Sequence, residues 1–246
     1  MANYVILVLL EVMQLFELHF DLNLIRILLA FSMLFVASTV DIKKREINDM
    51  LWIVFGAIAT VLVFLEPNLW STITHIGFSM IIAPVALFVW RMGVFGGADA
   101  LALITLAALA PYPNATFTGK EITPFTTLTN AAILSVTPII TNIIRNLLAI
   151  SKHEDIFEGF HESRLNKVIA MFIGYRAKNP KYSFLIEKTE NNTKRLDFSL
   201  HHAENATFCD TNNTWVTPGI PYLIYITGGF LIQVFYGDII FNFLRA

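Results

Sequence analysis

Two aspartates in this 246-residue sequence stand at the ends of apolar segments, where a carboxylate is costly. Asp41 follows a long apolar run that finishes with "ASTV", and Asp99 opens the run "ALALITLAALAP". Ionisable side chains at membrane depth usually mark function and usually have a partner. Two carboxyl groups brought together share a proton, so one takes a proton from water while the other hydrogen-bonds a peptide carbonyl. These residues therefore predict hydrolysis of a peptide bond by an aspartate pair.

A purely structural explanation of Asp99 stays open at this point. An aspartate in the first turn of a helix caps exposed amides and meets the positive end of the helix dipole. Gly96 and Gly97 precede it, and glycines allow a close backbone approach or a bend that other residues resist. Spacing does not decide whether Asp41 and Asp99 meet, because 58 positions separate them in the sequence.

The elements that must position these acids are membrane helices. Hydrophobic residues make up 55% of the chain and charged residues only 15%, against about 25% charged residues in an ordinary soluble domain. Several segments approach or reach the ~20 apolar residues that a transmembrane helix needs. The expected fold class is an α-helical polytopic membrane protein with six transmembrane helices and a small β-containing domain. The expected spans are residues 22–40, 50–65, 71–90, 99–110, 127–150 and 221–240.

Four segments follow from this pattern. Residues 1–21 form an N-terminal extension that we expect to add a helix, and residues 22–150 hold the first five spans with both aspartates. Residues 151–217 are polar, with a basic helix at 165–175 followed by short strands in "YSFLIE", "RLDFSL" and "ATFCD", and predict a small soluble domain. Residues 218–246 hold the sixth span and the C-terminus.

Basic residues predict the orientation. Lys43, Lys44 and Arg45 follow the first span, and Arg91 follows the third. The loops on the opposite side contain only Lys120. Because loops rich in Lys and Arg face the cytoplasm, both aspartates and the soluble domain are expected at the cytoplasmic face of a multi-pass cell-membrane protein.

The segments "ASTVDIKKREINDMLW" and "FGGADALALITLAALAP" resemble the two active-site motifs of the archaeal preflagellin and prepilin peptidases, membrane aspartic proteases of the GxGD class. The resemblance covers about residues 24–245. It implies six transmembrane helices, a small cytoplasmic β-containing domain, no cofactor and no metal. It also implies two catalytic residues, Asp41 and Asp99. The matching motif residues are Lys43, Arg45 and Glu46 around the first aspartate, and Gly96, Gly97 and Ala98 before the second.

The sequence departs from that pattern in three ways. Ala98 occupies the third position of the GxGD motif, and Val40 stands where presenilin-like relatives carry tyrosine, which argues against that branch. Cys209 is the single cysteine, so the cysteine-rich zinc region of bacterial prepilin peptidases is not expected. Residues 1–21 have no counterpart in the family pattern.

The resemblance implies a precursor substrate with a short basic leader, a cleavage point and then a hydrophobic helix. Such a leader stays on the cytoplasmic side of the lipid bilayer, level with the two aspartates, and nucleic acid is not an expected partner. Gly93, Gly96 and Gly97 suggest flexibility beside Asp99, so the aspartate pair is expected to assemble when substrate binds. Glu46 and Asp49 have a lesser chance of contacting the leader's positive charges.

Three other functions stay open. A presenilin-type intramembrane protease would need acids deeper in the bilayer. A proton- or ion-coupled transporter would need polar residues near the bilayer midplane. Its candidates are Thr60, Thr105, Ser135, Thr137 and Thr141. An inactive membrane scaffold would leave the paired motifs unexplained.

Overall fold

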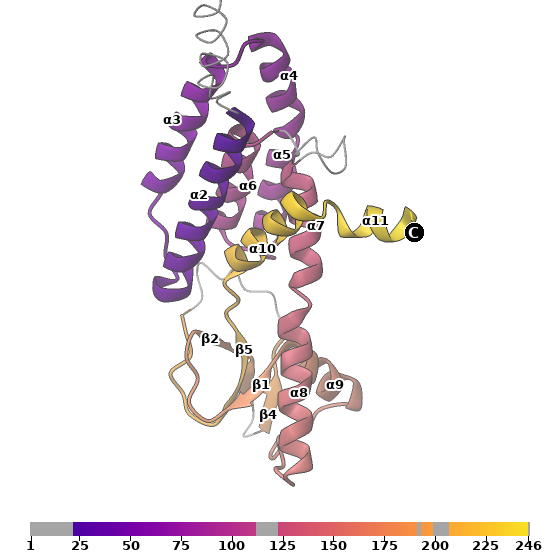
Figure 1. The fold of residues 1–246 in the computed structure, drawn as a ribbon. Helices are drawn as coiled ribbons and strands as arrows, with labels where there is room; N and C mark the ends of the chain where they lie inside the picture. The colour runs from indigo at the N-terminus through magenta and orange to yellow at the C-terminus, as the bar shows by residue number, and fades with distance from the viewer. Residues whose placement is uncertain (1–21, 112–122, 191–192, 199–206, 246) are drawn as a thin grey trace, which may run out of the picture.

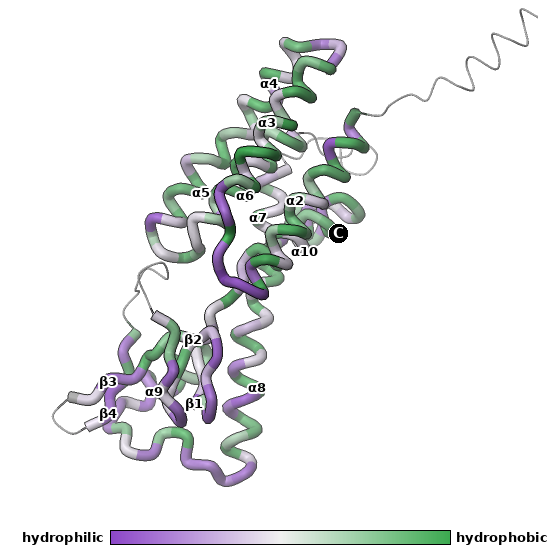
Figure 2. Tube along the Cα trace, turned by 90° about the vertical axis from the view of Figure 1, so that its left-hand side faces the viewer, coloured by the Kyte–Doolittle hydropathy of each residue, from purple (hydrophilic) through white to green (hydrophobic). Residues whose placement is uncertain are grey.

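The computed structural model describes residues 22–111, 123–190, 193–198 and 207–245. These residues form a bundle of apolar helices with a smaller α/β unit at one end (Figure 1). Hydrophobic residues dominate the bundle, whereas hydrophilic residues gather in the smaller unit (Figure 2). The expected extra helix within residues 1–21 lies outside the described residues.

The first four described segments of the bundle, with two consecutive helices counted as one, alternate in direction (Figure 1). α2 (Leu22–Lys44) runs toward the small unit and α3 (Met50–Phe64) runs away from it. α4 (Leu69–Ser79) and α5 (Ile82–Arg91) together run toward the small unit, and α6 (Gly97–Leu109) runs away again. The end of α2 and the start of α6 therefore lie at the same end of the bundle.

Two expected spans are interrupted near a proline. α4 ends at Ser79, next to Met80, which lies four positions before Pro84. α7 (Thr123–Leu134) ends at Leu134, which lies four positions before Pro138. Proline lacks an amide hydrogen and its ring clashes with the carbonyl of the residue four positions before it, so the helix is broken there. α8 (Thr137–Ser151) continues from α7 toward the small unit (Figure 1).

The sixth expected span is wrong in its extent. α10 (Tyr222–Phe235) ends before residue 240, and α11 (Ile239–Arg245) leaves in a different direction (Figure 1). Gly237 between them has φ 91°, a conformation that L side chains rarely adopt. Asp238 accepts the amide of Phe241 at 3.0 Å, so it caps α11.

Three helical segments are long and apolar enough to cross a bilayer: Leu22–Lys44, Leu69–Arg91 and Thr123–Ser151. The other three expected spans fall on shorter apolar helices, Met50–Phe64, Gly97–Leu109 and Tyr222–Phe235. The longest of these, α3, has 15 residues. A helix of that length reaches only about 22 Å, less than the ~30 Å of a hydrocarbon core. Six transmembrane helices therefore remain a prediction.

α6 is enclosed by its neighbours. It contacts α2, α3, α4, α5, α7 and α10, and most of its side chains are buried. Three of its alanines, Ala100, Ala102 and Ala107, are at most 1% exposed, and such small residues let neighbouring helices approach closely. The helix that begins at the Asp99 motif is thus held on all sides by the bundle.

The small unit is built on α8 and α9 (Arg164–Ile173) with five short strands. The strands are β1 (Tyr175–Ala177), β2 (Ser183–Leu185), β3 (Glu187–Glu190), β4 (Thr193–Leu196) and β5 (Thr214–Pro218). β5 pairs antiparallel with both β1 and β2, and β3 pairs antiparallel with β4. Trp215 on β5 is fully buried and stacks on Phe157 at 4.8 Å between ring centroids.

The sequence predicted that this unit contains a helix and strands, but it did not predict the positions of all the strands. The basic helix is confirmed, although it ends at Ile173, and the strand expected in "YSFLIE" is confirmed by β2. The strand expected in "RLDFSL" coincides with β4 only at residues 195–196, and β3 was not expected. The strand expected in "ATFCD" is wrong for its described residues 207–210, which make one backbone hydrogen bond from Cys209 to Ser183 but no strand. The central strand β5 was not expected, because its burial comes from pairing with segments distant in sequence.

α8 connects the two units. It packs against α9 and β1, and its Asn146 is 2% exposed. The Asn146 amide donates to the carbonyls of Met171 and Gly174 at 3.0 and 2.8 Å. The packing of the small unit thus begins within this helix.

Candidate active site

Asp41 and Asp99 lie at the same end of the bundle, the end that faces the small unit (Figure 1). Asp41 belongs to the last turn of α2, and Asp99 is the third residue of α6. α2 and α6 are in contact, and the carboxyl groups of the two residues interact electrostatically. The fold thus brings into one region two acids that are far apart in the sequence.

Asp99 is enclosed and bonded to its own helix start. The residue is only 7% exposed, and its Oδ2 accepts the amide of Gly96 at 2.9 Å. The capping explanation of Asp99 is therefore part of the observed structure. Gly96 has no side chain to return the second bond of a capping box, so Asp99 secures the helix start alone. The bond to Gly96 occupies Oδ2 and not the other carboxyl oxygen, Oδ1.

Asp41 has different surroundings. It is half-buried rather than enclosed, and its backbone carbonyl accepts the amide of Arg45 at 3.0 Å. Arg45 also interacts electrostatically with the Asp41 carboxyl group. One acid of the pair therefore has a cation beside it, whereas the hydrogen bond to the other comes from a neutral backbone amide.

The remaining motif residues divide between the two helix ends. Lys43 and Glu46 are exposed, and Arg45 is half-buried in the segment that follows α2. Gly96, Gly97 and Ala98 are half-buried at the start of α6. Just before them Gly93 has φ 75°, a turn conformation suited to glycine.

Two tyrosines that the sequence analysis did not single out lie at this end of the bundle. Tyr222, the first residue of α10, stacks on Phe95 at 5.5 Å and interacts electrostatically with Asp99. Tyr182, in the turn between β1 and β2, lies against the end of α2 and contacts Arg45. No local pattern marks either tyrosine, because both arrive there through long-range packing.

Several polar side chains of the bundle make hydrogen bonds within the protein. Four of the five candidates for a transport path bond to backbone carbonyls three or four residues earlier in the chain: Thr60, Ser135, Thr137 and Thr141. Asn130 donates to the Gly237 carbonyl at 3.0 Å, and Thr127 donates to Gln233 at 2.6 Å. These bonds fasten α7 to α10, which is a structural role.

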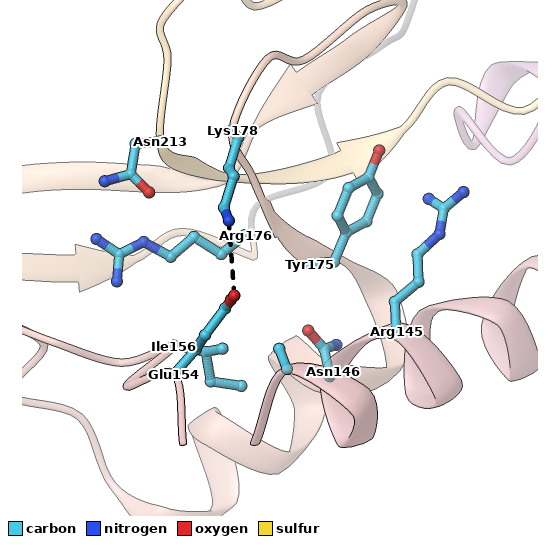
Figure 3. Close-up of a pocket in the computed structure, with 9 residues that line it drawn as sticks. Arg145, Asn146, Glu154, Ile156, Tyr175, Arg176, Lys178 and Asn213 are labelled. Atoms are coloured by element: carbon cyan, nitrogen blue, oxygen red, sulfur yellow. Dashed lines mark ion pairs between the residues drawn. The ribbon is translucent and has the colours of Figure 1, made fainter. Parts of the chain in front are cut away.

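A small pocket in the α/β unit is lined by three basic residues (Figure 3). Lys178 points toward Glu154, with which it pairs at 3.5 Å, while the guanidinium groups of Arg145 and Arg176 point in different directions (Figure 3). Their charges therefore do not converge on one ligand atom. Among the described residues, no group of three or more His, Cys, Asp or Glu side chains is placed to hold a metal ion.

Comparison with known proteins gives two family matches. Residues 28–140, which include both aspartates, match the type IV leader peptidase family. Residues 166–239, which include most of the small unit and α10, match the type II C-terminal region of archaeal A24 peptidases. The two matches together cover most of the bundle and much of the unit attached to it.

Individual relatives agree with the family matches. The preflagellin peptidase of Methanocaldococcus jannaschii is 28% identical over 222 residues, which cover 83% of this chain and 91% of that protein. The preflagellin peptidases of Methanococcus maripaludis and Methanococcus voltae are each 27% identical, and each match covers 86% of this chain and 94% of the relative. The likeness thus extends over nearly the full length of each relative.

Proposed function

Because the chain belongs to the type IV leader peptidase family, we propose that it is a membrane aspartic endopeptidase that removes the leader from preflagellin or a similar type IV pilin-like precursor. One observation carries the assignment of the catalytic residues. The family match contains Asp41 and Asp99, and the fold brings these two acids to one end of the same bundle. The other acids described in that matched region, Glu46, Asp49 and Glu66, lie in segments that connect helices.

We propose that Asp41 is the base and Asp99 the acid. Arg45 stabilises negative charge on Asp41 by Coulomb attraction, whereas Asp99 is enclosed by apolar helices that disfavour a second charge. Water attacks the carbonyl carbon of the scissile peptide bond as Asp41 takes its proton. Asp99 gives its proton to the carbonyl oxygen, for which Oδ1 is available because Oδ2 is bonded to Gly96. When the carbon–nitrogen bond breaks, the proton held by Asp41 passes to the leaving amine, and one hydroxyl of the tetrahedral intermediate returns a proton to Asp99.

The proposed topology follows from the basic residues at the active end. Lys43, Lys44, Arg45 and Arg91 all lie where α2 and α5 end, beside the small unit. By the positive-inside rule we propose six membrane-spanning segments, with this end and the small unit in the cytoplasm. A precursor with a basic leader then presents its cleavage point at the level of the two aspartates, while its hydrophobic helix lies in the bilayer.

The assay is cleavage of a preflagellin-type precursor by the full chain in membranes, with Asp41→Asn and Asp99→Asn tested separately. Each change is expected to lower the rate by roughly 10³-fold or more, because neither carboxyl group can act as both acid and base. Asp49→Asn is the matched control, since Asp49 is an exposed acid eight residues after Asp41. Substantial cleavage by either active-site variant would contradict the proposal.

A further inference from the structure

The small unit contacts the end of α2 through Tyr182. The Tyr182 hydroxyl donates to the Lys43 carbonyl at 3.5 Å, and the Arg45 guanidinium carbon lies 5.3 Å from the centre of the Tyr182 ring. The last carbonyls of a helix have no partner within the helix and need one from elsewhere. The small unit supplies that partner at the turn of α2 that carries Asp41.

Arg45 and Tyr182 share an unusual backbone conformation. Arg45 has φ 58° and Tyr182 has φ 51°. Both angles fall in the left-handed region, where glycine is the usual residue. Bulky residues in this region cost of order 1–3 kcal/mol and persist where the surrounding structure requires them, often at functional sites. Two such residues from different units contact each other here, beside one of the proposed catalytic acids.

Arg45 passes this contact on to Asp41. Its amide donates to the Asp41 carbonyl at 3.0 Å, and its side chain attracts the Asp41 carboxyl group electrostatically. Its Nε is buried without a hydrogen-bond partner among the described residues, so the Tyr182 ring face provides much of its stabilisation. Loss of the ring would leave this guanidinium free to turn toward Asp41 or solvent.

Tyr182 is itself held from the other side. Its carbonyl accepts the amide of Gly219 at 2.8 Å, and a Cβ at Gly219 would lie 2.7 Å from that same oxygen. Gly219 stands three residues before Tyr222, which lies beside Phe95 and interacts with Asp99. One short segment before α10 is therefore connected to both proposed catalytic acids.

We infer that Tyr182 is a positioning residue of the proposed reaction: it holds Arg45, and through Arg45 the turn of α2 that carries Asp41. The inference rests on the proposed function, and it gives the small unit a part in catalysis. Tyr182 does not touch the reacting atoms. Its loss moves Asp41 relative to Asp99, which slows the chemical step and leaves precursor binding unchanged.

The test compares Tyr182→Leu and Tyr182→Phe in the precursor cleavage assay. Tyr182→Leu removes the ring and the hydroxyl, and kcat is expected to fall about tenfold or more with KM unchanged. Tyr182→Phe keeps the ring over which Arg45 lies, and is expected to retain most of kcat. Tyr175→Leu is the matched control, because the Tyr175 ring lies in the same unit and its centre is 4.7 Å from the guanidinium carbon of Arg145 rather than that of Arg45.

Arg45 variants separate positioning from folding. Arg45→Gly relieves the positive φ and keeps the amide bond to Asp41, so the unfolding midpoint is expected to stay or rise while kcat falls. Arg45→Lys is expected to restore part of kcat. In the double variant with Tyr182→Leu, the loss from Arg45→Gly should be largely absorbed, because the two residues act as one unit.

Three results would overturn the inference: equal kcat for the Tyr182→Leu and Tyr175→Leu variants, an effect confined to KM, or fully additive losses in the double variant. The aspartate variants keep this outcome distinct from failure of the proposed function. If Asp41→Asn and Asp99→Asn are inactive while Tyr182→Leu is fully active, only the positioning role of Tyr182 is contradicted. Active aspartate variants remove the proposed function itself.

Discussion

The two ends of the helical bundle use charge in opposite ways, although α2 and α6 take part in both. At the end away from the small unit, Arg26 of α2 is fully buried and bonds to Glu66 at 3.0 Å and to the Leu109 carbonyl at 3.0 Å. At the other end the same two helices bring two acidic residues, Asp41 and Asp99, into one region.

We infer that one end of the helix pair α2 and α6 contributes stability, whereas the other end carries the proposed chemistry. The Arg26 end pairs opposite charges and ties α2, α6 and the segment after α3 into a closed contact. The aspartate end places near each other two groups that cannot both be charged without repulsion, and the N-cap residue of its helix, Gly96, has no side chain of its own. A closed end can hold the helices firmly enough for the other end to keep an unfavourable arrangement that chemistry needs.

The largest effect expected from this comparison is on the Arg26 end. Arg26→Met removes the guanidinium and leaves Glu66 and the Leu109 carbonyl without their buried donor, which should cost about 3 kcal/mol of folding free energy. Cleavage per folded molecule should stay within about threefold. Unfolding of the detergent-solubilised protein and the precursor assay measure the two quantities.

Asp99→Asn makes the opposite prediction at the other end. Asparagine still accepts the Gly96 amide, so the unfolding midpoint should hardly change while cleavage is lost. Arg91→Met is the control for Arg26, since Arg91 is exposed at the end of α5. If Arg26→Met abolished cleavage in folded protein, the separation of the two ends would be wrong.

The sequence predicted the general design of the active end because that design depends on local signals. Apolar runs, the basic residues Lys43 and Arg91, and the glycines before Asp99 were enough to place both acids at one end. The sequence did not reveal the partner of Arg26, since Glu66 lies 40 residues away and neither residue has a local motif. Tyr182 and Tyr222 were missed for the same reason: long-range packing, rather than periodicity, brings them to the helix ends.

The next prediction tests whether cleavage requires α10 to keep its position against α7. A Cβ at Gly229 would lie 2.5 Å from the Thr127 carbonyl and 2.8 Å from the Ala131 amide, which are backbone atoms of α7. Gly229→Ala should therefore push α10 from α7 at a cost of about 1–3 kcal/mol and displace Tyr222 from Asp99, lowering kcat.

The matched control is Gly56→Ala on α3, where a Cβ would meet nothing within 4 Å. That change should stabilise the helix by up to about 1 kcal/mol and leave cleavage unaltered. If Gly229→Ala lowered the unfolding midpoint but left kcat intact, the active end would tolerate movement of α10. The position of α10 would then not matter for the proposed reaction, and the difference between the two ends would depend on α2 and α6 alone.

The smallest expected effect is on the stability of strand β5 in the small unit. There a third arrangement of charge, around Glu187, can be compared with the two ends of the bundle. Glu187 accepts hydrogen bonds from Lys194 at 2.8 Å, Thr214 at 2.9 Å and the Trp215 amide at 3.1 Å. Burial raises the pKa of Glu187, but the hydrogen bonds from Lys194, Trp215 and Thr214 outweigh burial and leave that pKa below its ordinary value. This acid therefore makes a direct ion pair, as Glu66 does, whereas Asp99 accepts the neutral amide of Gly96.

A carboxyl group whose pKa is lower in the folded state contributes stability that is complete above its unfolded pKa, which for Glu187 is about 4.5. That contribution is lost as the pH falls through the folded pKa. Hydrogen exchange of β5 should therefore quicken below about pH 4.5 in the wild type, and Glu187→Gln should remove this pH dependence. The control is Glu158→Gln, because the Glu158 side chain is 75% exposed and lies 3.8 Å from Arg176, and exposed ion pairs add little stability. If acid quickened hydrogen exchange of β5 equally in Glu187→Gln, the contacts of Glu187 would not stabilise the sheet. The ion pair of Glu187 would then not explain the stability of this unit.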